Sequence, residues 1–574
     1  MTNSPTLRRL SDIHEGDTAA RRWIRSSMDL GASAAEACKT CPKPVWFTAF
    51  FDGTGNNYGE DGSALGQDAT NPEKTKYSNI AKLAFFAQRK KTDEIPRTRT
   101  EYIEGVGTPC PKVGDSGGGL DGALGMAAAR KGELRIRWML DQLKDHVTRH
   151  MPFVNQINLA VFGFSRGATQ ARAFVRMLAD TLAFQQGDEL IWREAGLNSR
   201  QPRVVVYFLG VFDTVSSTGF GGSRAETLAA AAAFALPIIG PTAGGVLRGL
   251  DKGGHAEWSR DLRIPSYVTQ CVHYVAAHEL REKFPSDSVR EDQTMPSNCI
   301  ELFYPGMHSD VGGGYAYLSQ EDRTNELARV PLNNMFIEAW KAGVPFKPVS
   351  EILASAGALF EISADLEHCW NVYMGQDDVK GTGSPRPGGK LETQIIWHMN
   401  RYYEWRGSRR RRLRDGRLKP PGGIDPYMIG TDEEWGKDIV NVAQSRTGWI
   451  RNSVHAHEEA MYEAFTGQWI GSLDRDTRAA FDRFFDRYVH DSVAGFKRQM
   501  KEASLALYYT EMSRWSRNRQ YFMGKRGDGF LYWRYEGWTP EYSGTQTAML
   551  ERSPLPHESD VSAPIMANEG ARMA

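Results

Sequence analysis

Cysteine is scarce in this sequence, with six residues in a chain of 574. So few cysteines over such a length do not form the disulfide framework that holds small secreted domains together. Cys38 and Cys41 make a single C-x-x-C pair, and no second pair follows at the spacing of a zinc site. We therefore interpret them as two ordinary thiols in a loop.

An excess of charge of one sign is also absent, because Lys and Arg total 70 and Asp and Glu total 70. A nucleic-acid-binding protein would carry a basic excess, so we expect no nucleic-acid partner. The first residues of the sequence lack the apolar core of a Sec signal peptide. We therefore expect synthesis in the cytoplasm and, if the protein acts elsewhere, export by a different route.

Charged residues are missing altogether from residues 227–247, a stretch close in length to a membrane span. Two prolines, Pro237 and Pro241, and several glycines interrupt it, so a transmembrane helix is not the preferred interpretation. We assign it to an apolar insertion over residues 225–255. A mobile lid or lipid-facing flap and a buried helical hairpin are equally consistent with this composition.

Apolar runs typical of strands recur along the first half of the chain. Several are apolar throughout, as expected for strands that are buried on both faces. They cover residues 45–51, 102–104, 157–162, 204–212, 267–275 and 300–304. Helical patterns over residues 127–149 and 168–182 lie between some of these runs. The alternation predicts the α/β class, with a mostly parallel sheet and helices on both faces.

Changes in composition divide the chain into four regions. We expect a flexible leader over 1–43, the α/β domain over 44–330, a mainly helical region over 331–540 and a disordered tail over 541–574. Within the helical region, residues 401–419 contain nine Lys or Arg against two acids. We expect this region to face a membrane or a partner, because such a stretch can meet anionic headgroups. A solvated loop is the alternative.

The sequence Gly163-Phe-Ser165-Arg-Gly167 is a G-x-S-x-G motif between an apolar strand and a helix. This is the strand–turn–helix setting of a nucleophile elbow. The turn is so tight that a side chain at either glycine would clash, and it lifts the serine hydroxyl above the sheet. We therefore predict Ser165 as a nucleophile. The N–H of Arg166, at the helix start, is a predicted donor to a developing oxyanion.

A serine nucleophile needs a base and an acid that orients the base. Asp213 follows the strand 204–212, at the same edge of the sheet as the elbow, and is our candidate acid. His308 lies on a glycine-rich loop after the strand 300–304 and is our candidate base.

Two other histidines compete with His308 for the role of base. His278 follows the preceding strand and is the main rival, and His490 is a third candidate. His273 lies within a strand, so we expect it in the core.

A second glycine cluster follows the first strand and includes Gly53 and Thr54. Its backbone is predicted to supply another oxyanion donor. The cluster lacks the Gly-Lys-Ser/Thr ending of a phosphate-binding P-loop, which argues against nucleotide binding. We expect no cofactor and no metal, and the alternative is a calcium ion shared by Asp52 and Asp310.

Six motifs occur in order along about residues 45–320: FFDGTGNN, EYIEGVGT, GGGLDGALG, GFSRGA, GVFDTV and GMHSDVGGGY. Together they resemble the α/β-hydrolase family of type VI secretion phospholipase effectors, the antibacterial lipase toxins. The resemblance implies an α/β-hydrolase fold with the serine of GFSRG as nucleophile and Asp213 as acid. The implied substrate is a membrane glycerophospholipid cleaved at an acyl ester, as by a phospholipase of the A type.

The same resemblance implies partners and a site of action. The effector would be loaded on a secretion spike protein, delivered into the periplasm of a rival bacterium and neutralised in kin cells by an immunity protein. The base carries over to either His308 or His278, since both surrounding sequences look family-like.

Two other functions stay open at this point. A soluble carboxylesterase or thioesterase is disfavoured by the uncharged insertion. A non-catalytic hydrolase-fold binding module is disfavoured because Ser165 and Asp213 are both intact.

Overall fold

The computed structural model describes most of the chain. The described residues are 5–13, 43–59, 76–87, 97–117, 126–196, 199–216, 257–259, 261–281, 284–291, 294–375, 391–420, 423–446, 462, 473–495, 519–524, 530–534 and 540–543. The predicted insertion over 225–255, most of the leader, the C-x-x-C pair and most of the tail lie outside them.

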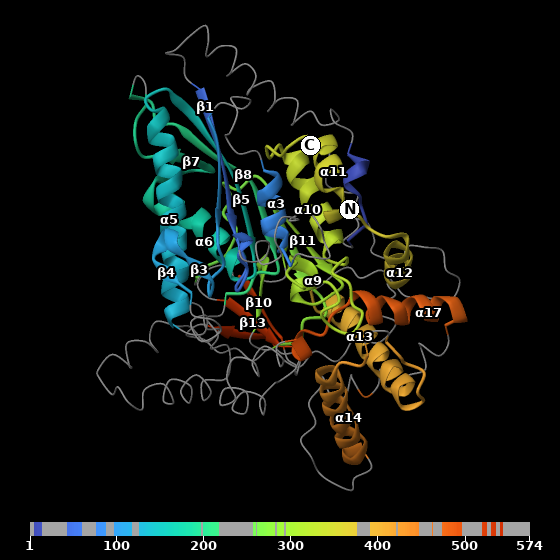
Figure 1. The fold of residues 1–574 in the computed structure, drawn as a ribbon. Helices are drawn as coiled ribbons and strands as arrows, with labels where there is room; N and C mark the ends of the chain where they lie inside the picture. Colours follow the sequence, from blue (N-terminus) through green and yellow to red (C-terminus); the bar gives the residue numbers. More distant parts are fainter. Residues whose placement is uncertain are drawn as a thin grey trace, which may run out of the picture.

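An eight-stranded sheet forms the centre of the molecule (Figure 1). Six of its strands are mutually parallel. In spatial order they are β2 (Thr98–Ile103), β1 (Lys43–Phe51), β5 (Val154–Phe164), β8 (Arg203–Phe212), β9 (Cys271–Ala276) and β11 (Cys299–Tyr304). Two short strands, β6 (Ala183–Gln186) and β7 (Glu189–Trp192), form a hairpin that joins β8 in the antiparallel sense. The predicted α/β class with a mostly parallel sheet is confirmed.

Helices cover both faces of this sheet, which explains why its strands are apolar throughout. The helices α5 (Met126–His150) and α6 (Arg166–Thr181) lie on one face, with α3 (Asn79–Phe86) and α10 (Arg329–Ala342) on the other (Figure 1). Along β1, Phe50 belongs to one core, whereas its neighbours Ala49 and Phe51 belong to the other. Alternate residues along the strand therefore pack into two separate hydrophobic layers, one on each face of the sheet.

A smaller four-stranded sheet joins the C-terminal part of the chain to the α/β domain. In it, β10 (Ser286–Glu291) pairs in parallel with β12 (Gln520–Gly524), which continues antiparallel into β13 (Phe530–Arg534) and β14 (Pro540–Ser543). These strands were not predicted. Among the described residues, the region 331–540 thus contains strands at 520–524 and 530–534 besides its helices, and the predicted disordered tail begins within β14.

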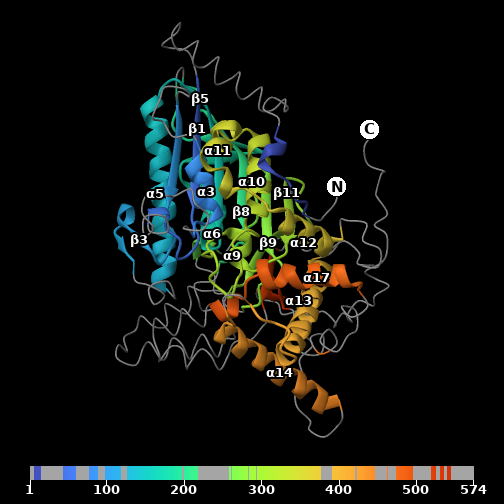
Figure 2. The same ribbon diagram turned by 45° about the vertical axis from the view of Figure 1, so that its right-hand side comes forward.

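The helical part contains α11 (Val349–Ala356), α12 (Ala364–Met374), α13 (Leu391–Arg414), α14 (Pro426–Arg446) and α17 (Arg475–Arg483). In Figure 2 these last three helices lie beyond the lower end of the central sheet. Two further two-residue strands, β3 (Pro109–Cys110) and β4 (Asp115–Ser116), pair with each other. Among the described residues, no helix is both long and apolar enough to cross a membrane.

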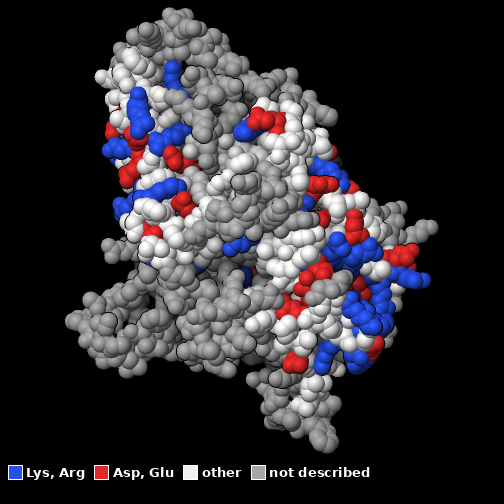
Figure 3. Space-filling view, in the orientation of Figure 1, with Lys and Arg blue, Asp and Glu red and all other residues white. Residues whose placement is uncertain are grey.

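The basic stretch 401–419 is mostly helix rather than a solvated loop, and part of it is internal. Arg406 and Arg409 are fully buried and form ion pairs with carboxylates that include Asp432, so they cannot meet headgroups as expected. Arg410 and Arg414 remain exposed. Basic side chains gather over α13 and α17, interspersed with acids (Figure 3).

Candidate active site

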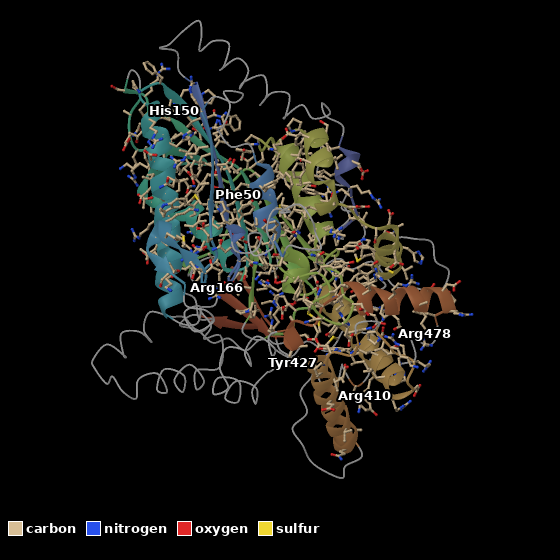
Figure 4. All side chains as sticks on the ribbon, viewed as in Figure 1. Phe50, His150, Arg166, Arg410, Tyr427 and Arg478 are labelled. Carbon is tan, nitrogen blue, oxygen red and sulfur yellow. The ribbon has the colours of Figure 1, made fainter. Side chains whose placement is uncertain are left out.

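Ser165 occupies the sharp turn between β5 and α6, as the motif predicts. Its backbone has φ 57° and ψ −125°, a region that costs a residue with a side chain about 1–3 kcal/mol. A Cβ at Gly163 would lie 2.3 Å from the Gly167 carbonyl oxygen, and one at Gly167 would lie 2.3 Å from the Phe51 carbonyl oxygen. Both glycines are therefore required by the close approach of backbone at this turn. Figure 4 shows the neighbouring Arg166 at the lower end of the sheet, opposite the end marked by His150.

Backbone hydrogen bonds tie the elbow to the end of the adjacent strand β8. The Ser165 N–H donates to the Phe212 carbonyl at 3.0 Å, and the Val215 N–H donates to the Ser165 carbonyl at 3.2 Å. Asp213 lies between these two partners and also has a positive φ, of 38°. The carboxyl ends of two parallel strands thus bring Ser165 and Asp213 to the same place.

His308 is the third residue at this edge of the sheet, where it contacts Asp213. It is the first residue of α9 (His308–Gly312), which follows β11, and its Nδ1 lies 2.6 Å from Oδ2 of Asp213. The imidazole packs on the ring of Phe164, the residue before Ser165, with ring centroids 4.6 Å apart. Because Nδ1 faces the carboxylate, Nε2 is the nitrogen left to act on a hydroxyl.

The charges of this site favour an ionised acid and a neutral base. Burial by itself would raise the pKa of Asp213, but the charge of Arg519 and the hydrogen bond from His308 outweigh it and hold that pKa well below 3.8. Burial lowers the pKa of His308 below 6.5, although contact with Asp213 opposes the shift. A neutral imidazole beside a carboxylate is the state that accepts a proton from serine.

The rival base His278 lies in the core rather than beside Asp213. Its Nδ1 accepts the Gly306 N–H at 2.9 Å, and its Nε2 lies 2.9 Å from the Tyr373 hydroxyl. Burial lowers its pKa to about 3. Both ring nitrogens are therefore engaged away from the acid.

The other two histidines also have partners of their own. Nδ1 of His490 lies 2.6 Å from Oδ1 of Asp310. His273 is buried, as expected, and its Nδ1 lies 2.9 Å from Oε2 of Glu301. Of these four histidines, the structure thus brings only His308 into contact with Asp213.

The glycine cluster after β1 lies next to the elbow but differs from expectation in one detail. The Gly53 N–H donates to Oδ1 of Asp52 at 2.7 Å, so it is not available to an oxyanion as predicted. Thr54 stands one residue further on, and its Oγ1 accepts a hydrogen bond from Nε of Arg166. The Thr54 and Arg166 amides therefore remain the candidate oxyanion donors.

The two carboxylates considered for calcium are engaged by separate protein donors. Asp52 accepts the hydroxyls of Ser78 and Tyr102, each at 2.6 Å. Asp310 accepts the backbone N–H groups of Met307 at 2.9 Å and His490 at 3.0 Å. No cluster of three or more His, Cys, Asp or Glu suited to a metal occurs in the described part of the chain.

One residue of this site was missed by the sequence analysis. Arg519, just before β12, donates from Nη2 to Oδ2 of Asp213 at 2.7 Å. It lies 306 positions from Asp213 along the chain and belongs to none of the six motifs. No local pattern in the sequence pointed to it.

A family model described as "T6SS, Phospholipase effector Tle1-like, catalytic domain" matches residues 47–195 and 184–338, together just over half of the chain. The chain belongs to this family. The resemblance drawn from the six motifs is therefore confirmed, and with it the class of phospholipase effector of the type VI secretion system. Secretion by that system follows from membership of this Tle1-like family.

Solved structures resemble this Tle1-like chain at low sequence identity. An uncharacterized protein from Pseudomonas aeruginosa aligns with a TM-score of 0.52 and 20% identity, over 90% of this chain and 74% of its own, and so shares the fold. A Tle1 effector solved bound to the VgrG spike of the type VI secretion system aligns with a TM-score of 0.32 and 19% identity, over 63% of this chain and 84% of its own. No curated protein matches the chain.

The depressed pKa of His308 predicts how activity depends on pH. Because only the neutral imidazole accepts a proton, kcat/KM should be highest at neutral and alkaline pH and fall to half of its maximum at a pH below 6.5, since the pKa of His308 lies below 6.5. The measurement is kcat/KM on a water-soluble ester from about pH 4 to about pH 9, since kcat/KM reports groups of the free enzyme. A half-maximal point at or above pH 6.5 would contradict this description of the site.

Proposed function

We propose that this chain is a serine hydrolase of the phospholipase A type, which cleaves acyl esters of membrane glycerophospholipids. In this proposal Ser165 is the nucleophile, His308 the base and Asp213 the acid. The observation that supports it most is the 2.6 Å contact between Nδ1 of His308 and Oδ2 of Asp213, beside a strained serine turn. Family membership supports the lipid substrate.

The reaction proceeds in two halves. The Ser165 Oγ attacks the ester carbonyl carbon while Nε2 of His308 takes the hydroxyl proton. The ester C–O bond then breaks, His308 returns the proton to the leaving lysophospholipid oxygen, and an acyl-serine forms. Water then attacks this acyl-serine while His308 takes one of its protons. His308 returns that proton to the Ser165 oxygen as the acyl C–O bond breaks, and the free fatty acid leaves. Asp213 keeps its charge throughout and stabilises the imidazolium.

The oxyanion of each tetrahedral intermediate needs preorganised donors. We assign this role to the amides of Arg166, at the start of α6, and Thr54. A helix start carries a partial positive charge, which favours the developing anion. Removal of one such donor typically costs about 100- to 1000-fold in kcat. No metal ion or cofactor takes part in this scheme, because the charges are all supplied by protein groups.

The proposed chemistry is tested by release of fatty acid from phospholipid vesicles. Ser165→Ala and His308→Gln should each lose at least about 10⁴-fold in kcat, as in other triads. His278→Gln, a matched change at a buried histidine, should keep activity within about tenfold, since this side chain supports packing rather than chemistry. The same rates are expected with a chelator and with added calcium.

Several outcomes of this assay would contradict the proposal. Ser165→Ala with wild-type activity would remove the serine mechanism, and a loss in His278→Gln equal to that in Ser165→Ala would move the base. Release of a headgroup without fatty acid would exclude A-type cleavage. Activity on soluble esters alone would favour a carboxylesterase or thioesterase, and no activity at all would favour a binding module.

We further propose that the effector travels on a secretion spike protein, acts in the periplasm of the target cell and is neutralised by an immunity protein in kin cells. Type VI effector family membership supports delivery into another cell. The expected result is that expression in a susceptible bacterium is lethal when a Sec signal directs the chain to the periplasm and harmless without it. Lethality should vanish with Ser165→Ala, and equal toxicity in both compartments would contradict the periplasmic site.

A further inference from the structure

Arg519 is held by three hydrogen bonds at the back of the Asp213–His308 pair. Its Nη2 donates to Oδ2 of Asp213 at 2.7 Å, its Nη1 to the Ala276 carbonyl at 2.9 Å and its Nε to the Phe284 carbonyl at 2.7 Å. Its side chain is only 2% exposed. Three N–H groups of one planar guanidinium are thus aimed at fixed acceptors, which leaves the side chain little freedom.

The position of Arg519 is fixed by the second sheet. The next residues form β12, whose Tyr521 pairs with Ser286 of β10 and whose Phe522 pairs with Asp287. β10 follows Phe284 closely and lies near the lower end of the central sheet (Figure 1). The pairing of β12 with β10 therefore brings Arg519 next to Asp213, although Arg519 lies outside the matched catalytic domain, residues 47–338.

Arg519 and His308 share one oxygen of the acid. Oδ2 of Asp213 accepts from both of them, at 2.7 Å and 2.6 Å, while Oδ1 accepts the Ala276 N–H at 3.0 Å. Three donors define the orientation of the carboxylate. The positive charge of Arg519 also offsets part of the negative charge of Asp213, which would otherwise stabilise a protonated His308.

The other charges around His308 come from one pair on the loop after β9. The His308 N–H donates to Oε2 of Glu279 at 3.3 Å, and Arg281 pairs with the same carboxylate at 2.9 Å. Arg281 also stacks on Phe284, whose ring contacts His308. Around His308 and its partner Asp213, the charges of two carboxylates are thus balanced by the guanidinium groups of Arg281 and Arg519. Without Arg519, the surroundings carry an excess negative charge.

We propose that Arg519 is a positioning residue of the active site, which holds the Asp213 carboxylate against His308 and offsets part of the negative charge of that carboxylate. This proposal rests on the proposed function. It makes the segment just before β12 part of the active site, so the matched domain alone lacks a group that holds the acid in place.

The test compares Arg519→Gln and Arg519→Lys with a matched control, Arg409→Gln. Arg409 is likewise buried and ion-paired, but its partners are Glu321 and Asp432. Arg519→Gln should lose about 10- to 100-fold in kcat, the range typical of groups that orient a functional histidine. The acid limb of its kcat/KM profile, which is the fall in activity at low pH, should move up by on the order of one pH unit. The reason is that the negative charge of Asp213 beside His308 is no longer offset by Arg519. KM should change little.

Arg519→Lys keeps the charge but cannot donate to all three acceptors in one plane. It should lose kcat while its acid limb stays at the wild-type position. Arg409→Gln should lower the melting temperature without moving the limb. This contrast separates an effect on the imidazole from a loss of stability.

The proposal is overturned if Arg519→Gln retains the wild-type kcat and acid limb. It is equally overturned if Arg519→Gln and Arg409→Gln lose activity only in proportion to their loss of stability, while the low-pH fall of kcat/KM stays at the wild-type pH in both variants. Should Arg519→Gln fail to fold, Arg519→Lys decides alone, and wild-type kcat in that variant rejects the positioning role. Ser165→Ala run alongside identifies failure of the proposed function itself, since wild-type activity would then persist without the serine.

Discussion

The hydrogen bond between Asp213 and His308 is the interaction on which the rest of the site depends. A buried carboxylate is costly unless it is paired and hydrogen-bonded. Here the partners come from three distant parts of the chain: the backbone of Ala276 at the end of β9, His308 at the start of α9, and Arg519 before β12. The need to pair this carboxylate therefore ties together the end of β9, the loop after β11 and the segment before β12, which belongs to the smaller sheet.

The strained elbow is supported by close packing around Phe164. A Cβ at Gly53 would lie 2.4 Å from this ring, and one at Gly312 would lie 1.9 Å from it. The same ring packs against His308 in a tilted arrangement. Two glycine-rich motifs, far apart in sequence, therefore converge on Phe164 of a third motif, GFSRGA, and Gly53 and Gly312 leave room for its ring. This packing makes the three motifs depend on one another physically, because a side chain at Gly53 or Gly312 would displace the ring of Phe164.

The sequence predicted what depends on local pattern and on the rule that parallel strands end at one edge. Ser165, Asp213 and His308 each follow an apolar run, and this placement brings them together. Arg519 and β12 could not be predicted, because their partners are chosen by tertiary contact over hundreds of residues. Gly53 was assigned an oxyanion role from backbone alone, whereas the neighbouring Asp52 side chain takes its N–H. Arg409 looked like a surface cation, and only its buried acidic partners show otherwise.

The central claim is that His308, oriented by Asp213, activates Ser165 as a nucleophile. The most direct measurement is labelling of the purified protein with a fluorophosphonate, followed by peptide mapping of the adduct by mass spectrometry. Our account predicts one adduct, on Ser165, formed rapidly by the wild type and at a strongly reduced rate by the His308→Gln variant. An adduct on a different residue, or no adduct on a protein that still hydrolyses phospholipid, would contradict it.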